Sequence, residues 1–94
     1  AQGADAAGML TLPGEPTSYS VVINPPGIDR SFLHCPGVND AFDPDAVPDS
    51  LLRGAALLHF GYPPLMRRVY EDGGAALARL FARARTLGLR TSLD

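Results

Sequence analysis

The chain has 94 residues and a net charge of −2 at pH 7, enough sequence for one small domain with a single modest core. Hydrophobic residues make up 46% of it and charged residues 19%, as in ordinary globular domains. The slightly acidic balance gives no reason to expect nucleic acid or an anionic membrane as a partner. All eight cationic residues are arginine, which excludes a lysine nucleophile and a lysine-based phosphate loop.

The lone cysteine, Cys35, excludes an internal disulfide, and no apolar run approaches the length of a membrane-spanning helix. No basic segment followed by an apolar one suggests a signal peptide, so we predict a soluble, cytoplasmic protein. The chain begins at Ala1 without a methionine and stops at Asp94 directly after a strand-like run. Because domains usually close with an exposed tail or a docked helix, we expect a piece of a longer protein.

The first third of the chain predicts a loop and a hairpin. Residues 1–16 are rich in Ala, Gly and Pro and predict a lead-in loop. Residues 17–35 hold two β-branched and aromatic runs around Asn-Pro-Pro-Gly, the pattern of a β-hairpin. Because side chains alternate along a strand, Tyr19, Val21 and Ile23 should share one face of it.

The middle of the chain predicts a loop, a short helix and a strand. Residues 36–55 begin with a loop, and a short helix is expected near residues 45–55, with Pro48 in its first turn or at its end. Residues 56–61 form a continuous apolar run, typical of a strand that is buried on both faces of a parallel sheet.

The last third predicts a helix and a strand. Pro63-Pro64 suits the first turn of a helical segment, and Gly73-Gly74 interrupts it. Asp72 can cap the next helix, Gly88 fits the left-handed position after its end, and residues 89–93 return as a strand. The helix between them carries an apolar stripe at spacings of three and four, formed by Leu77, Leu80, Phe81, Ala84 and Leu87.

Residues 56–94 therefore predict a strand, a helix and a second strand. With so long a crossover the two strands should be parallel and the connection right-handed. Ligands of open α/β sheets gather at the carboxyl ends of the strands. We therefore expect Gly61-Tyr62 and Asp94 to lie on the same functional edge.

Four short motifs, taken together in their order and spacing, resemble those of one protein family. They are Thr-Ser-Tyr at residues 17–19, "PGVND" at 36–40, "ALLHFGYPP" at 56–64 and "TSLD" at 91–94. The chain from Thr17 to Asp94 is similar to the front-middle part of the PfkB (ribokinase-like) carbohydrate kinases. The resemblance implies an α/β fold, a three-layer α/β sandwich with a small β-sheet lid. The hairpin would belong to the lid and residues 56–94 to the main sheet as one right-handed βαβ unit, in a single partial domain.

The resemblance also implies an activity, transfer of the ATP γ-phosphoryl group to a sugar or nucleoside hydroxyl with Mg²⁺ and a general-base aspartate. Position by position, Asn39 matches a residue that contacts substrate hydroxyls, and Ser18 lies in the lid strand that covers the sugar. Tyr62 matches a position in the family where a pocket-lining residue follows a strand. Asp94 matches an aspartate that lies near the phosphates and the metal in the family. The family's early Gly-Gly motif and its Gly-Ala-Gly-Asp motif, which supplies the base, are both absent. The chain alone is therefore predicted to contain no catalytic residue and to be inactive.

Each of these residues also has a structural interpretation. Asn39 suits a turn or a cap, Tyr62 suits packing against the lid, and Ser18 suits the exposed face of a hairpin. The two histidines and Cys35 match no zinc spacing, and His59 is expected as a hydrogen-bonded histidine inside a buried strand.

A different class of function remains open, a stand-alone, non-catalytic α/β binding module whose hairpin pairs with a partner. Lid hairpins of such kinases often pair between subunits, so a homodimer through the hairpin is also expected. In either case the two buried-type strands have too few helices to cover them, which predicts exposed apolar surface and self-association.

Overall fold

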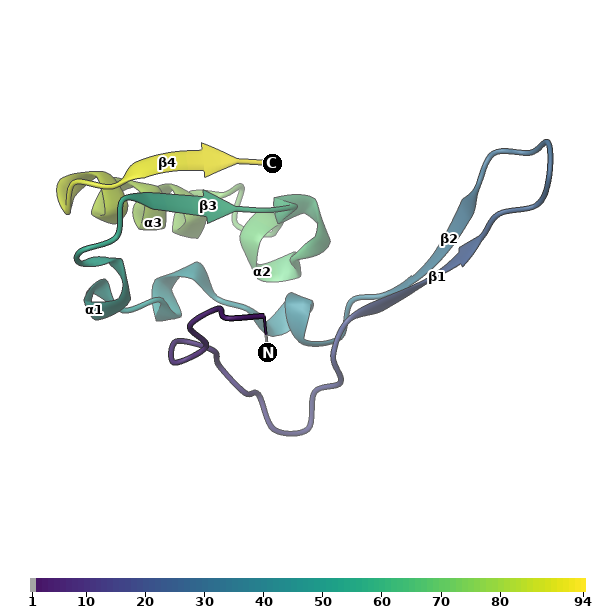
Figure 1. The fold of residues 1–94 in the computed structure, drawn as a ribbon, viewed down its shortest axis with the longest axis horizontal. Helices are drawn as coiled ribbons and strands as arrows, with labels where there is room; N and C mark the ends of the chain where they lie inside the picture. The colour runs from purple at the N-terminus through teal and green to yellow at the C-terminus, as the bar shows by residue number, and fades with distance from the viewer. Residues whose placement is uncertain (1) are drawn as a thin grey trace.

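The computed structural model describes residues 2–94 and shows a mixed α/β chain with two separate two-stranded sheets. Residues 2–18 contain no helix or strand, as predicted for the lead-in loop up to residue 16. In Figure 1 a long hairpin projects from a body of short helices and two strands. The elements in chain order are β1 (Tyr19–Ile23), β2 (Ser31–Cys35), α1 (Asp49–Leu52), β3 (Leu57–Phe60), α2 (Arg67–Tyr70), α3 (Ala75–Thr86) and β4 (Arg90–Leu93), with 3-10 turns at Gly37–Ala41, Pro44–Ala46 and Pro63–Leu65.

The body is built on the predicted strand, helix and strand. β3 and β4 pair in parallel, with Leu57 opposite Arg90 and Phe60 opposite Leu93. The helix between them, α3, turns the predicted apolar stripe toward the core, because side chains spaced three and four apart lie on one side of a helix. Leu77, Leu80 and Ala84 of the stripe are buried, and Phe81 and Leu87 are partly buried against them. The core that results joins α3 to both strands and to the shorter helices, and its buried members are Leu52, Phe60, Val69, Leu77, Leu80, Ala84 and Leu89.

The prediction that β3 is buried on both faces is wrong for this chain. Phe60 is 7% exposed, whereas Leu57 is 50% exposed and His59 is exposed as well. Since alternate side chains of a strand point to opposite faces, one face of the β3–β4 sheet is packed against the core and the other is open. An apolar run shows that a strand needs cover on both faces, but it does not show that the same chain provides that cover.

The ends of α3 follow the predicted capping chemistry. Asp72 precedes the helix, and its carboxylate accepts hydrogen bonds from the backbone N–H groups of Gly74, Ala75 and Ala76 at 2.9, 3.1 and 3.0 Å. These N–H groups have no partner inside the helix, so the carboxylate satisfies them. At the other end Gly88 has a φ of 91°, the left-handed conformation predicted for it.

Replacing Asp72 with alanine should lower the free energy of unfolding by about 1–2 kcal/mol, because three N–H groups lose their acceptor. Thermal and urea unfolding followed by circular dichroism at 222 nm would measure the loss. Glu71→Ala is the matched control, since it removes an exposed neighbouring carboxylate that accepts none of these bonds. Equal stability of the two variants would contradict the assigned role of Asp72.

The predicted helix over residues 45–55 is divided in two. A 3-10 turn at Pro44–Ala46 and the single-turn α1 are separated at Pro48, which has an extended ψ of 151° and takes the N-cap position of α1. Proline suits the start of a helix but interrupts one that is already running, so Pro48 ends the first turn and opens the second.

The hairpin is confirmed, and it stands apart from the core. β1 and β2 are antiparallel, with Tyr19 opposite Cys35 and Ile23 opposite Ser31, so Tyr19, Val21 and Ile23 share one face as predicted. Every residue of β1, and every residue of β2 up to His34, is exposed. An isolated two-stranded hairpin is only marginally stable in water, and this one carries apolar side chains on both faces.

The extended shape leaves much surface uncovered. The solvent-accessible surface is 6882 Å², whereas a compact monomer of this mass exposes about 5,200 Å². The radius of gyration is 15.8 Å, against about 12 Å for a compact domain of this length. The predicted exposure of apolar surface is therefore confirmed. Among residues 2–94 no helix has the length and hydropathy to cross a membrane.

Candidate functional site

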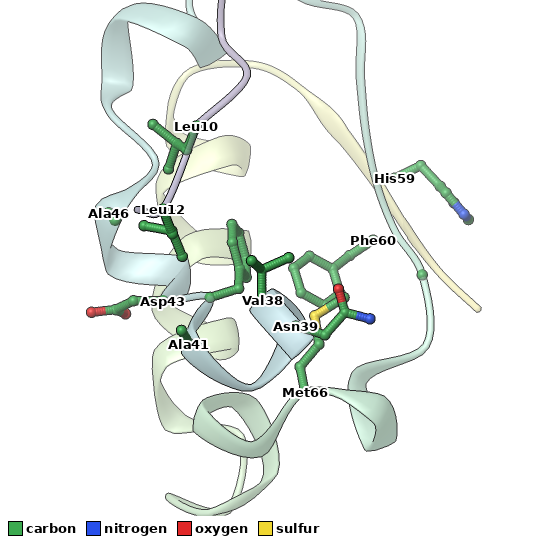
Figure 2. A pocket seen from close by; sticks show the side chains of 12 residues that line it. Leu10, Leu12, Val38, Asn39, Ala41, Asp43, Ala46, His59, Phe60 and Met66 are labelled. Atoms are coloured by element: carbon green, nitrogen blue, oxygen red, sulfur yellow. The ribbon is translucent and has the colours of Figure 1, made fainter. Parts of the chain in front are cut away.

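A cavity of about 310 Å³ lies between the Gly37–Ala41 turn and the carboxyl end of β3 (Figure 2). Its wall is mostly apolar, and the side chains come from segments that are far apart in sequence. A volume of this order is the lower end of what small-ligand sites occupy. The large apolar side chains of the wall are Leu10, Leu12, Val38, Phe42, Phe60 and Met66.

Asn39 supplies the one carboxamide of this wall and is half-buried. Its backbone closes the 3-10 turn, since its N–H donates to the Pro36 carbonyl at 3.0 Å and its carbonyl accepts from Phe42 at 3.4 Å. Within residues 2–94 the carboxamide itself makes no hydrogen bond. Asn39 thus has the turn role predicted as its structural interpretation, and in addition leaves a donor and an acceptor at the cavity.

His59 also borders the cavity, but its ring points away from it (Figure 2). The ring Nδ1 lies 2.8 Å from the Ser92 hydroxyl oxygen on β4, the residue directly opposite in the parallel register. The predicted hydrogen-bonded histidine is therefore present, although on the open face of the sheet rather than inside a buried strand.

Tyr62 and Asp94 lie at one edge of the β3–β4 sheet, as predicted. The Tyr62 N–H donates to the Asp94 carbonyl at 3.0 Å, and the Asp94 N–H donates to the Phe60 carbonyl at 3.0 Å. Tyr62 has φ 54° and ψ 55°, a left-handed backbone conformation that is strained for an aromatic residue. The proline that follows Tyr62 adds to this strain, because a residue before proline favours an extended conformation. Its exposed side chain does not line the cavity.

Ser18, the fourth predicted site residue, lies where the hairpin joins the body. It is half-buried at the base of the hairpin, close to Gly37, where the chain enters β1. The structure thus brings Tyr62 and Asp94 together at the sheet edge and places Asn39 at the neighbouring cavity. Neither Ser18 nor any residue of β1 or β2 lines that cavity.

Residues 2–94 contain no group of three or more His, Cys, Asp or Glu side chains that could hold a metal ion. In β2, His34 has its Nδ1 2.8 Å from the Ser20 hydroxyl on β1, and Cys35 beside it is half-buried. Mg²⁺ at nucleotide sites takes one or two carboxylates together with substrate phosphates, and Asp94 is the candidate at this edge. The described residues do not by themselves fit a complete Mg²⁺–ATP site.

Two arginines of α3 hold the Asp-rich segment between residues 43 and 49 against the body. Arg79 makes two hydrogen bonds to Asp45, the shorter at 2.7 Å. The Arg83 guanidinium donates to the Asp49 carboxylate at 2.8 Å. It also donates to the backbone carbonyls of Val47 and Pro44 in the same segment. The apolar stripe of α3 did not by itself predict a partner for these arginines. The repeated Asp at 43, 45 and 49 was the available signal of a partner.

The hydrogen bonds and charge of Arg79 hold the pKa of Asp45 below its ordinary value, and Asp45 raises the pKa of Arg79. A carboxyl whose pKa is lower in the folded state contributes stability above its unfolded pKa, and that contribution is lost as pH falls through the folded value. This pair therefore stabilises the fold at neutral pH and ceases to do so in acid.

Arg79→Gln should return the pKa of Asp45 upward toward its ordinary value. A carbon-detected NMR titration of the side-chain carboxyl would measure the shift. Arg85→Gln, on the same helix, is the control, because Arg85 donates to the Phe81 carbonyl and to no carboxylate. An unchanged pKa of Asp45 in Arg79→Gln would show that the pair does not persist in solution.

No protein-family model matches the chain, and no curated protein or solved structure is significantly similar to it.

Proposed function

We propose that this chain is part of an ATP-dependent carbohydrate kinase of the PfkB type and contributes lid strands and part of the sugar pocket. The observation that carries the proposal is the placement of Asn39. Its carboxamide, which has no hydrogen-bond partner among residues 2–94, lines a cavity beside the carboxyl end of β3, the position where open α/β sheets bind ligands. A carboxamide both donates to and accepts from hydroxyl groups, which suits a sugar or a related polyol.

The sheet edge next to the cavity supports the same proposal. Tyr62 is held there in a strained backbone conformation, and such conformations cluster at functional sites. Asp94 adds a carboxylate at the neighbouring strand end. When bound, ATP would supply the phosphoryl group and Mg²⁺ would neutralise its charge. The general base and most of the ATP contacts would come from other parts of the longer protein.

The uncovered apolar surface supports the proposal that this chain is one part of a larger α/β domain. The open face of the β3–β4 sheet and the bare hairpin are surfaces that other layers of an α/β sandwich would cover. This interpretation accounts for the surplus surface and the large radius of gyration together.

The deciding experiment is an ADP-release assay with a panel of sugars, run on this chain and on the longer protein that contains it. We expect turnover only in the longer protein. There, Asn39→Ala should lower kcat/KM for the best sugar by about 10- to 100-fold, the effect of losing one or two hydrogen bonds to substrate. Asn24→Ala, in the hairpin loop, should leave it unchanged. No turnover in either protein, or turnover in this chain alone, would overturn the proposal.

A second candidate function, a non-catalytic binding module, is favoured by the hairpin. Each of its strands has one pairing partner and one free edge, and apolar residues stand on both faces. Free edges and bare apolar faces are the features by which strands pair with other chains. Absence of turnover in the longer protein would favour this module over the kinase.

In both cases we propose that the partner of the hairpin is a second copy of the chain. One face of the hairpin is the more apolar, with Tyr19, Val21, Ile23 and Leu33, whereas the other carries the Ser20–His34 hydrogen bond. Val21→Thr combined with Leu33→Thr should weaken self-association in sedimentation velocity. Val22→Thr, on the opposite face, should weaken it much less. A chain that is monomeric at all concentrations would contradict the dimer.

A further inference from the structure

The lead-in loop covers one side of the cavity with two leucines. Leu10 and Leu12 form part of the cavity wall, but they remain 57% and 36% exposed, so each covers the cavity with only part of its side chain (Figure 2). Residues 8–10 also border a second hollow of about 290 Å³ beside α1, whose wall includes Leu51. The loop therefore lies over the body without filling the space beneath it.

Residues 2–15 of the same loop make no hydrogen bond to the body. The Met9 N–H donates to Ala6 at 3.0 Å, the Ala7 N–H to the Asp5 side chain at 3.0 Å, and the Glu15 N–H to Leu12 at 3.4 Å. These bonds stay inside the loop. The first bond that ties the segment to the body is accepted by the Pro16 carbonyl from Val38, at 2.8 Å. Attachment of residues 8–12 thus depends on apolar contact alone.

The contact with α1 is close at one point. A Cβ added to Gly8 would lie 2.9 Å from a terminal methyl group of Leu51, and Gly8 does not have a positive φ. A larger residue at position 8 therefore meets no backbone strain, but it must push the loop away from α1 or displace the leucine. Two kinds of substitution can therefore release the loop from the body: a larger residue at Gly8, or polar residues in place of Leu10 and Leu12.

We propose that residues 8–12 form a displaceable strap that covers one side of the cavity at rest and opens it into a wider apolar groove, with Asn39 at its border, when it swings away about Pro16. Two half-exposed leucines give the closed state a modest advantage, because the apolar area that they remove from water is small. The open state is therefore a minor population in the resting protein. The inference does not depend on the reaction proposed above.

The chain contains two methionines, and they report on the two sides of this contact. Met9 lies on the strap and is exposed, whereas Met66 lies in the cavity wall and is half-buried. With ¹³C-methyl methionine and a soluble gadolinium chelate, the Met9 signal should be strongly broadened and the Met66 signal protected. In the double variant Leu10→Ser, Leu12→Ser, we expect the relaxation enhancement of Met66 to rise several-fold toward that of Met9.

Thr11→Ser is the matched control, because Thr11 lies between the two leucines but does not line the cavity, and it should leave Met66 protected. Gly8→Val is the second variant and should expose Met66 without touching the leucines. Unchanged backbone amide shifts in β3 and β4 would show that the body is intact in each variant. Protection of Met66 in both opening variants would overturn the proposal.

Benzene, a small apolar probe, tests whether the strap controls access. Its titration, followed by the Met66 methyl shift, should give an affinity higher by about tenfold in the opening variants than in the wild type, since the probe no longer displaces the leucines. Equal affinities in the wild type and in both variants would show that the strap does not compete for the groove and would overturn the proposal.

Discussion

Gly37→Ala should lower the free energy of unfolding by about 2–4 kcal/mol, a large fraction of what a chain of this size has. Gly37 lies where the chain leaves the hairpin, and its φ is 50°. A Cβ there would collide with the Pro16 carbonyl oxygen and would lie 2.9 Å from the Ser18 nitrogen and 3.0 Å from the Thr17 carbonyl carbon. All three are backbone atoms, so no side-chain rotation relieves the collision.

Gly27→Ala is the control for this prediction. Gly27, in the hairpin loop, also has a positive φ, 73°, but nothing lies within 4 Å of the position that its Cβ would occupy. The substitution should therefore cost only the conformational strain, about 1 kcal/mol. Urea unfolding of both variants separates the two contributions. If both lost the same amount, the close approach of the two chain segments at Gly37 would not exist in solution.

Leu80→Ala should lower the free energy of unfolding by about 2–5 kcal/mol. Leu80 is 1% exposed at the centre of the apolar stripe, where α3 packs against the strands and the shorter helices. Truncation leaves a cavity in the main core of the body, and cores of small chains rarely supply more than a few kcal/mol in total. We therefore expect the variant to be largely unfolded at 25 °C by circular dichroism.

Leu65→Ala provides the comparison for Leu80→Ala. Leu65 follows the two prolines in the 3-10 turn and is exposed, so its truncation should cost less than about 1 kcal/mol. A Leu80→Ala variant as stable as Leu65→Ala would mean that α3 does not form the core described above.

The parts of the fold that follow from neighbouring residues could be predicted from the sequence. The stripe of α3, the cap at Asp72 and the left-handed Gly88 each depend on residues within one or two turns. The burial of β3 could not be predicted, because it depends on whether another layer of structure covers each face of the strand. The ion pair of Arg79 with Asp45 joins residues far apart in the chain, so the helix pattern alone could not reveal it.

Some residues of the candidate site could likewise be predicted from the sequence, and others could not. The order of motifs indicated Asn39, and strand topology placed Tyr62 and Asp94 on one edge. The cavity wall was missed, since Leu10, Phe42, Phe60 and Met66 come from separate segments with no common spacing. The left-handed Tyr62 was also missed, because a residue before proline is expected to be extended.

The separation of the two sheets has a consequence for the order of folding. The hairpin closes a short loop between β1 and β2, whereas pairing of β3 with β4 must wait until the long segment containing α3 has been brought back. Closure of the longer loop costs more entropy and is slower. During synthesis the hairpin is also translated first. We therefore expect its bare apolar faces to be present before the body can form, which makes the nascent chain a natural client for a chaperone.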